Sequence, residues 1–567
     1  MLSKDPAIPL NGRERLAPPR QSAIAHTRLL LVAALAVFTM TLGAKARAAT
    51  IMVDSLADTG APGICVLRDA ITAATTMTAT NGCAAGSGSD TINFSPRMTG
   101  TISLVSTLPE VTDTLLTING PASRNIIISG VVGPPAVFLQ QRVMEVATDA
   151  TLNLNNLSIA NGFTFMEGAG IDNAGTLTVA NSFFSGNSAI LGGGIFNGGV
   201  LTVTNSTFSE NSGAPPSGQS GAGGAIYNAG TTKIINSTFS GNFGKTSGGA
   251  IANVGALTVI NSTFFGNATS IAPIAGDGAG IQNSGTLTVT NSTFSSNGGG
   301  PGGGISNVGF ASLKNTILAK SSGGPFNPPS NCFGAITDAG YNISDDSTCG
   351  FAKTGSANNG DGVNPLLSSA GLADNGGPTQ TIALEGGSPA IDAIPVANCT
   401  DQAPLPQPIT NDQRSFLRPD PGEAACDIGA YESDALQVAN LDQSVSFCQF
   451  ASCGGGQFAA DSTGCPAGTQ GAFGFNAVLT DNLDTTISNL QIDLSILTNG
   501  NQWKLPSGQL VAAGASVSLS KTGAHDPLTG APNTDALDPG QSATVPFTIC
   551  LANRNTFLFF VDVFGAQ

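Results

Sequence analysis

The sequence contains very few of the residues that usually build metal centres. Among 567 residues there are two histidines, one tryptophan and three tyrosines, and only 10% of the residues are charged. The histidines, His26 and His525, lie near opposite ends of the chain, and no two cysteines are separated by only two residues. Zinc sites combine His and Cys ligands at close spacing, so the sequence argues against a zinc centre.

The middle of the chain has equally few groups suited to acid–base catalysis. Residues 168–330 contain neither arginine nor histidine. The charged residues of this stretch are Asp172, Glu210, Lys233, Lys245, Asp277, Lys314 and Lys320. Enzymes that cleave polysaccharides need a base with Ca²⁺-holding carboxylates, or closely spaced acids, and no such cluster is evident here. Exposed aromatic residues that could stack on a sugar are also few, with Phe196 and Tyr227 as candidates.

This stretch contains six copies of one sequence motif. Each copy has a Gly-rich turn, an isoleucine and a first asparagine, followed eight residues later by a second asparagine. In five of the six copies a third asparagine follows after six more residues. The first asparagines are Asn173, Asn197, Asn228, Asn253, Asn283 and Asn307, and the third are Asn187, Asn211, Asn242, Asn267 and Asn297. A repeat of this period indicates a stacked architecture.

The segments between the asparagines predict strands rather than helices. Residues such as Leu201 and Val203 alternate with threonine, β-branched side chains dominate, and no copy has a helical pattern of ten residues. Three short strands per copy, each ended by an asparagine turn, predict an all-β fold. We expect a right-handed three-sided parallel β-helix, a pectate-lyase-like solenoid.

Stacking would place equivalent side chains of successive copies in ladders. The inward phenylalanines should form one ladder, each buried ring contributing ~1.5–3 kcal/mol. The second asparagines should form another, because asparagine accepts left-handed turns and stacked asparagines can hydrogen-bond to one another. The expected ladder residues are Phe184, Phe208, Phe239, Phe264 and Phe294 with Asn181, Asn205, Asn236, Asn261 and Asn291.

The alternating motifs also resemble those of a known family. Gly-Gly-[Ala/Gly]-Ile followed by Phe-x-x-Asn, from Gly168 to Lys320, is similar to the repeat pair of the polymorphic outer-membrane proteins. Those are bacterial surface β-helices, several of them adhesins. The resemblance therefore implies the same fold and a place at the outer surface.

The start of the chain, residues 1–48, is predicted to be a secretory signal peptide. Basic residues precede an apolar run from Leu29 to Gly43, and Ala46-Arg47-Ala48 fits an A-x-A cleavage site. An uncleaved membrane anchor is the alternative, although the run is short for a span. These residues carry seven Lys/Arg and two Asp/Glu, so their removal changes the formal net charge from −16 to −21. Such acidity argues against nucleic acid and anionic lipid as partners.

Ten cysteines, an even number, suit an oxidising compartment. Their local grouping predicts the disulfides Cys65–Cys83, Cys332–Cys349 and Cys399–Cys426. The sequence leaves open how the last four cysteines pair, which are Cys448, Cys453, Cys465 and Cys550.

Two further segments carry resemblances that help to divide the chain. Cys65-Val-Leu-Arg-Asp-Ala70 is similar to the CSLREA segment that begins many secreted bacterial β-helices, and its apolar residues predict a short helix that caps the first coil. Residues 364–392 and 426–432 resemble the choice-of-anchor Q domain. We therefore expect a signal peptide (1–48), an N-terminal cap with the first coil (49–100), β-helix repeats (101–330), last coils with the choice-of-anchor Q-like region (331–434) and a β-sandwich (435–567).

Two short segments were weighed as chemical sites. Asp345-Asp346 is an adjacent acidic pair, for which we expect turn chemistry rather than catalysis. Asn358–Gly362 could hold Ca²⁺ through oxygen ligands, although an Asn-Asp-Gly turn is the commoner structure. We therefore assign no catalytic residue, cofactor or metal ligand.

The expected function is that of a secreted or cell-surface structural or adhesin-like protein without an evident catalytic centre. The alternative is a lyase-like, hydrolase-like or glycan-binding β-helix. The partner would be a surface protein or an extracellular glycan, and the mature chain would have no membrane span. Length varies between copies only after the third asparagine, where residues 212–222 and 268–277 form apolar insertions. Such insertions either mark a binding side or are neutral length variation.

Overall fold

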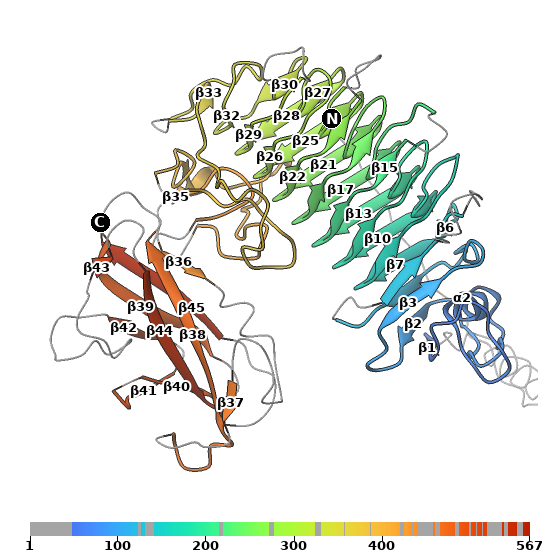
Figure 1. The fold of residues 1–567 in the computed structure, drawn as a ribbon, viewed down its shortest axis with the longest axis horizontal. Coiled ribbons are helices and arrows are strands. Elements are labelled where there is room, and N and C mark those ends of the chain that lie inside the picture. The colour runs from blue at the N-terminus through green and yellow to red at the C-terminus, as the bar shows by residue number, and fades with distance from the viewer. Residues whose placement is uncertain are drawn as a thin grey trace, which may run out of the picture. The chain divides into compact units, whose positions relative to one another are not determined.

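The computed structural model describes residues 48–566, except for 123–125, 131–140, 215–218, 271–276, 324–329, 356–357, 386, 420–424, 434–435 and parts of 440–558. The predicted signal peptide, apart from Ala48, lies outside the described residues. From Thr50 to Asp361 the strands coil into a parallel β-helix (Figure 1). None of the described helices is long and apolar enough to cross a membrane.

Each regular coil contributes one strand to each of three sheets. Sheet 1 has eleven strands, which are β1 (Thr50–Val53), β2 (Asp90–Phe94), β4 (Leu116–Asn119), β7 (Thr151–Asn155), β10 (Thr176–Ala180), β13 (Val200–Thr204), β17 (Thr231–Ile235), β21 (Ala256–Ile260), β25 (Thr286–Thr290), β28 (Phe310–Lys314) and β31 (Thr337–Asp338). Sheet 2 also has eleven, which are β3 (Gly100–Ser103), β5 (Ile126–Ser129), β8 (Ser158–Ala160), β11 (Phe183–Ser185), β14 (Thr207–Ser209), β18 (Thr238–Ser240), β22 (Thr263–Phe265), β26 (Thr293–Ser295), β29 (Ile317–Ala319), β32 (Ile343–Ser344) and β33 (Gly360–Asp361).

Sheet 3 is formed by the short strands that end at the first asparagines. Its eight strands are β6 (Met144–Val146), β9 (Ile171–Asn173), β12 (Ile195–Asn197), β16 (Ile226–Asn228), β20 (Ile251–Asn253), β24 (Ile281–Asn283), β27 (Ile305–Asn307) and β30 (Cys332–Phe333). At the corner after the third asparagine the coils add a narrow fourth strip that we did not expect. Its strands are β15 (Ser212–Gly213), β19 (Phe243–Gly244) and β23 (Ala268–Thr269).

The alternation of apolar and polar residues decides which side chains face the core. In β10, Leu177 and Val179 are fully buried, whereas Thr176 and Thr178 are half-buried on the outside. Successive side chains of a strand point to opposite faces, so each coil buries every second residue. Because the coils pair in register, the same positions are buried in coil after coil.

The phenylalanines of sheet 2 form a continuous stack inside the helix. Phe184, Phe208, Phe239, Phe264 and Phe294 are all fully buried and pair in register from β11 to β26. Their successive ring centroids lie 4.6, 5.0, 4.8 and 4.5 Å apart, and the ring planes differ by 4° to 11°. Each ring therefore rests on the ring of the coil above and of the coil below.

The first and third asparagines form two hydrogen-bonded ladders. From Asn173 to Asn307 each side-chain Nδ2 donates to the Oδ1 of the next first asparagine, at 2.6–2.9 Å. From Asn187 to Asn297 the third asparagines do the same at 2.9–3.0 Å. These side chains are buried, so the ladders satisfy polar groups that would otherwise be costly inside the coil.

The second asparagines have another role than the hydrogen-bonded ladder that we expected. Asn181, Asn205, Asn236, Asn261 and Asn291 have φ angles of 46° to 50°, in the left-handed region. Each is the first residue of the two-residue corner between sheet 1 and sheet 2, and its backbone N–H donates to the next coil. Asparagine is suited to this corner because it tolerates left-handed backbone better than most residues do.

The N-terminal end of the helix is closed by α2 (Leu67–Thr76). Its residues Leu67, Ala70, Ile71 and Ala74 are buried against the first coils, as the helical face in the sequence predicted. The following residues are tied back by the disulfide Cys65–Cys83. Arg68 donates from Nη2 to Asp58 at 2.8 Å and from Nη1 to the carbonyl of Thr107 at 2.7 Å, which fixes the cap to the body.

Residues 364–433, which we call the cover segment, fold back over the outer surface of the last coils. They include the paired strands β34 (Ile394–Pro395) and β35 (Ala425–Cys426), the short helix η1 (Val396–Asn398) and the disulfide Cys399–Cys426. Thr238, Thr263 and Thr293 of sheet 2 hydrogen-bond to this segment from β18, β22 and β26. The choice-of-anchor Q-like motifs thus lie beside the stack and do not extend it.

The C-terminal residues form two antiparallel sheets. One contains β36 (Leu436–Ala439), β37 (Gln457–Ala459), β38 (Ala472–Asp481), β40 (Gln502–Lys504), β41 (Leu510–Val511) and β44 (Ser542–Cys550). The other contains β39 (Ile487–Leu497), β42 (Ala515–Ser518), β43 (Ala536–Leu537) and β45 (Phe559–Ala566). Trp503 is fully buried and stacks on Phe547 at 4.6 Å, and Cys465 pairs with Cys550. Cys448 and Cys453 lie outside the described residues.

Candidate functional site

The outer face of sheet 3 carries acids and aromatics in a single column. The central residues of β6, β9, β12 and β16 are Glu145, Asp172, Phe196 and Tyr227, and each pairs in register with the next. All four side chains are half-buried. Two carboxylates beside two aromatic rings are the arrangement in this helix that most resembles a sugar-cleaving site, so their contacts decide what the column can do.

Arg142 forms ion pairs with both carboxylates of this column. Its guanidinium forms ion pairs with Glu145 and, at 2.9 Å, with Asp172. The same group donates to the backbone carbonyls of Glu167 and Gly168, at 2.6 Å and 3.0 Å. One arginine therefore clasps the irregular coil of β6 to the first regular coil.

The titration of Asp172 follows from this environment. Burial raises the pKa of Asp172, Arg142 opposes the rise, and Glu167 and Glu145 add to it. A raised pKa is common at catalytic acids, but a structural ion-pair network produces it as well. Here the Asp172 carboxylate, which would have to exchange a proton, is held in the ion pair with Arg142.

The two aromatic rings in the column stack on each other. Phe196 and Tyr227 stack with their centroids 5.6 Å apart and their planes 9° from parallel. A sugar ring packs on the flat face of an aromatic ring, and in this pair one face of each ring is covered by the other. The stack therefore resembles the buried phenylalanine ladder more than an open binding platform.

Asp172, Phe196 and Tyr227 stand out in the sequence, whereas Arg142 and Glu145 do not. Both precede the regular array, in a coil that lacks the Gly-Gly and asparagine signals. A usable signal was the alternation Met144-Glu145-Val146, with Met144 placed 27 residues before Ile171. That separation lies within the range seen between the repeats, so Glu145 could have been aligned with Asp172.

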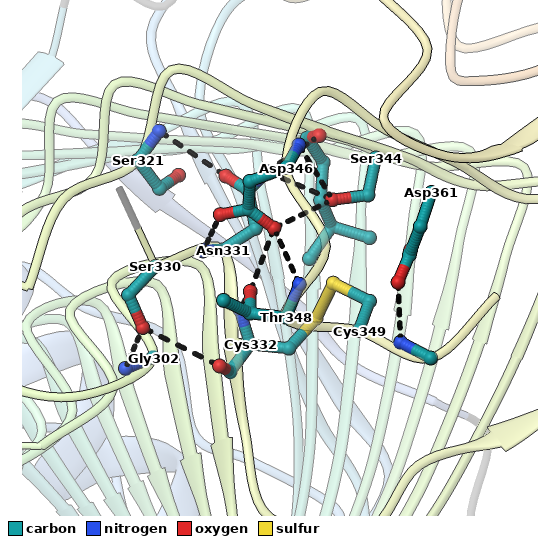
Figure 2. The surroundings of a disulfide bond; sticks show 12 residues. Gly302, Ser321, Ser330, Asn331, Cys332, Ser344, Asp346, Thr348, Cys349 and Asp361 are labelled. Atoms are coloured by element: carbon teal, nitrogen blue, oxygen red, sulfur yellow. Dashed lines mark hydrogen bonds between the residues drawn. A yellow bond between two sulfur atoms is a disulfide. The ribbon is translucent and has the colours of Figure 1, made fainter. Parts of the chain in front are cut away.

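The acidic pair near the end of the stack serves turns, as Figure 2 shows for Asp346. Asp346 accepts from the backbone N–H of Asn331 at 2.7 Å and from the N–H and hydroxyl of Thr348 at 2.9 Å and 2.7 Å. Asp345 accepts from the Asn331 side chain and from the Lys320 backbone. With the neighbouring disulfide Cys332–Cys349, the pair closes the C-terminal end of the helix.

The segment Asn358–Gly362, weighed as a Ca²⁺ loop, is also tied into this end. Asp361 accepts from the backbone N–H of Gly350 at 2.7 Å, and Asn359 exchanges two hydrogen bonds with Thr354. Within the described part of the chain, no group of three or more His, Cys, Asp or Glu side chains is placed to hold a metal ion.

A third cluster of charges lies inside the cover segment. Arg418 and Glu432 are fully buried with Nε and Oε2 2.9 Å apart, and Arg414 pairs with buried Asp412 at 2.7 Å. Asp427 accepts from the backbone N–H groups of Asp392 and Ser433. These residues belong to the Cys426–Glu432 motif and its partners, so the motif forms the polar core of the cover segment rather than a surface site.

Burial raises the pKa of Asp427 to about 7, with a further contribution from Asp392. Since the usual value is 3.8, the folded chain keeps a proton between the two values that the unfolded chain has released. We therefore expect the Asp427-linked part of the unfolding free energy to fall as the pH rises from about 4 to about 7, and to change little above that.

Urea unfolding of the wild type and of Asp427→Asn at several pH values measures this dependence. The difference in midpoint between the two proteins should change between pH 4 and 7 and become constant above pH 7. Glu110→Gln, a substitution at an exposed acid, should keep the wild-type profile. A difference that stays constant across the whole range would contradict the assignment.

The two apolar insertions are only partly visible. Residues 215–218 and 271–276 lie outside the described residues, so the expectation that they form a binding edge stays a prediction. Their ends belong to the strip of β15 and β23, which places both insertions at one corner of the helix.

Comparison with known proteins bears on the repeat region. Residues 144–320 match the family model described as right handed beta helix region. A search of curated proteins finds no match to the chain. The matched range contains all six copies of the motif and the strands from β6 to β29, and the chain folds as a right-handed parallel β-helix.

Proposed function

We propose that this chain is a secreted or cell-surface β-helix protein with a structural or adhesin-like role and without a catalytic centre. The proposal rests on the ion pairs and hydrogen bonds that Arg142 forms across two coils. Glu145 and Asp172 are the acids on the outer face of sheet 3, and one arginine joins both to backbone carbonyls of the neighbouring coil. A group held in this way stabilises the coil and is not free to transfer protons.

Other contacts and the disulfides of the described residues support the same role. The other acidic pair is engaged with backbone N–H groups at the end of the helix. Four described disulfides suit an oxidising environment such as the cell exterior. A long, rigid stack with local stability in every coil is a suitable scaffold for display at a surface.

The export part of the proposal predicts the N-terminus of the mature protein. Cleavage after the A-x-A motif should leave a chain that starts near Ala49, because signal peptidases recognise small residues at these positions. N-terminal sequencing of protein recovered from the medium or the cell surface measures this directly. Exported protein that still begins at Met1 would contradict it.

The binding part is tested by fractionating native cells and by attachment of the purified mature protein. We expect the protein in the medium or on the outer surface, and we expect labelled protein to attach to cells or to extracellular matrix. The chain after heat denaturation is the control for nonspecific adhesion. Protein found only inside the cell, or a folded protein that attaches to neither, would contradict the proposal.

A glycan-cleaving β-helix is the second candidate, and one observation favours it. The column of Glu145, Asp172, Phe196 and Tyr227 brings two acids and two aromatics to one outer face. If this column were catalytic, Asp172→Asn would abolish cleavage of a polysaccharide while the protein stays folded. If the clasp is structural, the same change lowers the stability of the first coils and affects no reaction.

A further inference from the structure

The outer face of sheet 1 is a regular array of threonine side chains. Two columns of side chains run along the helix axis over the strands from β7 to β25, which Figure 1 draws as successive parallel arrows. The first column is Thr151, Thr176, Val200, Thr231, Ala256 and Thr286, and the second is Asn153, Thr178, Thr202, Lys233, Thr258 and Thr288. Neighbours within a column are about 4.8 Å apart, the spacing of hydrogen-bonded strands.

The hydroxyls of this array are available to a partner. All twelve residues are half-buried or exposed. No side-chain hydrogen bond within the described residues involves the hydroxyl of Thr178, Thr202 or Thr258, and the same is true of the other threonines in the two columns. Lys233 is the one charged member, in a chain whose formal net charge is −16. The face therefore offers many neutral donors and acceptors at a fixed period.

The molecule itself shows what such columns bind. On sheet 2 the outward Thr238 accepts from the side-chain amide of Gln413 at 2.8 Å, and Thr263 donates to the same amide at 2.7 Å. One amide group thus bridges two successive coils. Thr293 in the next coil accepts from the backbone N–H of Ala430 at 3.0 Å.

The same kind of contact reaches the end of the sheet 1 array. Ser312 of β28 follows Thr288 in the second column. Its hydroxyl donates to the side-chain carbonyl of Gln402 at 2.7 Å, and the amide nitrogen of Gln402 donates to Thr290 at 3.0 Å. The unpartnered array is therefore continuous with a surface that already binds amide groups of the cover segment.

From this continuity we infer that the outer face of sheet 1 binds a neutral, extended glycan that carries amide groups, such as a β-1,4-linked N-acetylhexosamine polymer. The chain would lie along the helix axis, with ring hydroxyls and N-acetyl amides hydrogen-bonded to successive threonines as Gln413 is on sheet 2. Successive sugar units of an extended β-1,4-linked chain advance by a distance close to that between coils, and every second unit presents its N-acetyl group to the same side. This inference rests on the proposed binding role and names its ligand class.

The scarcity of cationic residues in the array separates this ligand from its competitors. An acidic polysaccharide needs several positive charges to offset its own, and Lys233 is the one cationic residue of the two columns. A protein partner of ordinary affinity needs several apolar anchors. Among the twelve positions of the array only Val200 and Ala256 are apolar, and Phe310 follows the first column at its β28 end. A neutral polymer with repeating donors and acceptors matches both the chemistry and the period.

The test is the binding of the purified mature protein to insoluble chitin, with soluble chitohexaose as competitor and cellulose and pectate as comparison polymers. The array variant is Thr202→Glu with Thr258→Glu, which places charge in the middle of the second column. The matched control is Ser158→Glu with Ser185→Glu, on outward positions of sheet 2 that the cover segment does not bind. Circular dichroism melting shows whether each variant remains folded.

We expect chitin binding by the wild type and the control variant, and an affinity at least about tenfold weaker in the array variant, as the loss of one or two net hydrogen bonds produces. Equal binding of both variants, absence of binding to chitin, or equally strong binding to cellulose or pectate would each overturn the inference. Attachment to cells or matrix without chitin binding would leave the proposed function standing, so the two can fail separately.

Discussion

Replacing Phe239 with alanine should lower the free energy of unfolding by about 3–5 kcal/mol. The ring is fully buried and lies between Phe208 and Phe264, at centroid distances of 5.0 Å and 4.8 Å. Its removal leaves a cavity that a rigid stack of in-register coils cannot close by moving one side chain. Urea unfolding followed by circular dichroism measures the loss.

Phe196→Ala is the matched control, because Phe196 also stacks on an aromatic neighbour but lies half-buried on the outer face. We expect its cost to be well below that of Phe239→Ala. Hydrogen exchange should show the added opening concentrated in the coils next to Phe239, since the core residues of each coil pack mainly against those of the neighbouring coils. Equal losses for the two variants, or an unchanged unfolding curve for Phe239→Ala, would mean that the buried ladder does not carry the stability of the array.

Replacing Arg418 with methionine should cost about 3–5 kcal/mol, because it leaves Glu432 buried without its cation. Both side chains are fully buried, and Arg418 also donates from Nη1 to the carbonyl of Gly429 at 3.0 Å. Loss of the guanidinium therefore removes a charge and a hydrogen bond that hold Arg418 against residues 427–432 in the core of the cover segment. Chemical unfolding, together with limited proteolysis of the cover segment, measures the effect.

The double variant Arg418→Met with Glu432→Leu separates the pair from its individual charges. Replacing a whole buried ion pair by apolar residues is often nearly neutral, so the double variant should recover most of the lost stability. The control is Lys233→Met, at an exposed residue that takes part in no described ion pair. It should change the free energy of unfolding little. A double variant as unstable as Arg418→Met would show that the arginine acts through its hydrogen bonds rather than through its charge.

The regular coils could be predicted because their information is local and repeated. Each copy contains the residues that determine its own turns and its own inward side chains. Alternation and spacing were therefore enough to predict the three sheets and the phenylalanines of the core. The distinction between the asparagines was not predictable in the same way. Asn181 has a left-handed backbone and a half-buried side chain, whereas Asn187 is buried in a hydrogen-bonded ladder. This difference depends on the geometry of the corners between the sheets.

The contacts on which the proposed function rests are long-range and could not be predicted from the spacing of residues. Arg142 lies 30 residues before Asp172, in a coil without the repeat motif, and Gln413 lies 175 residues after Thr238. Resemblance indicated that residues 364–432 form a unit, but not that its polar side chains bind outward threonines of the coils. These contacts show that a residue type common in strands, threonine, acts as a docking point on two sheets.

The central claim is that the protein binds through its outer faces and cleaves nothing with the acids of sheet 3. The most direct measurement is incubation of the mature protein with acidic and neutral polysaccharides in the presence of Ca²⁺, followed by chain length and newly formed ends. We expect unchanged polymers for the wild type and for Asp172→Asn, and a lower stability for the variant alone. Depolymerisation by the wild type that a folded Asp172→Asn protein has lost would contradict it.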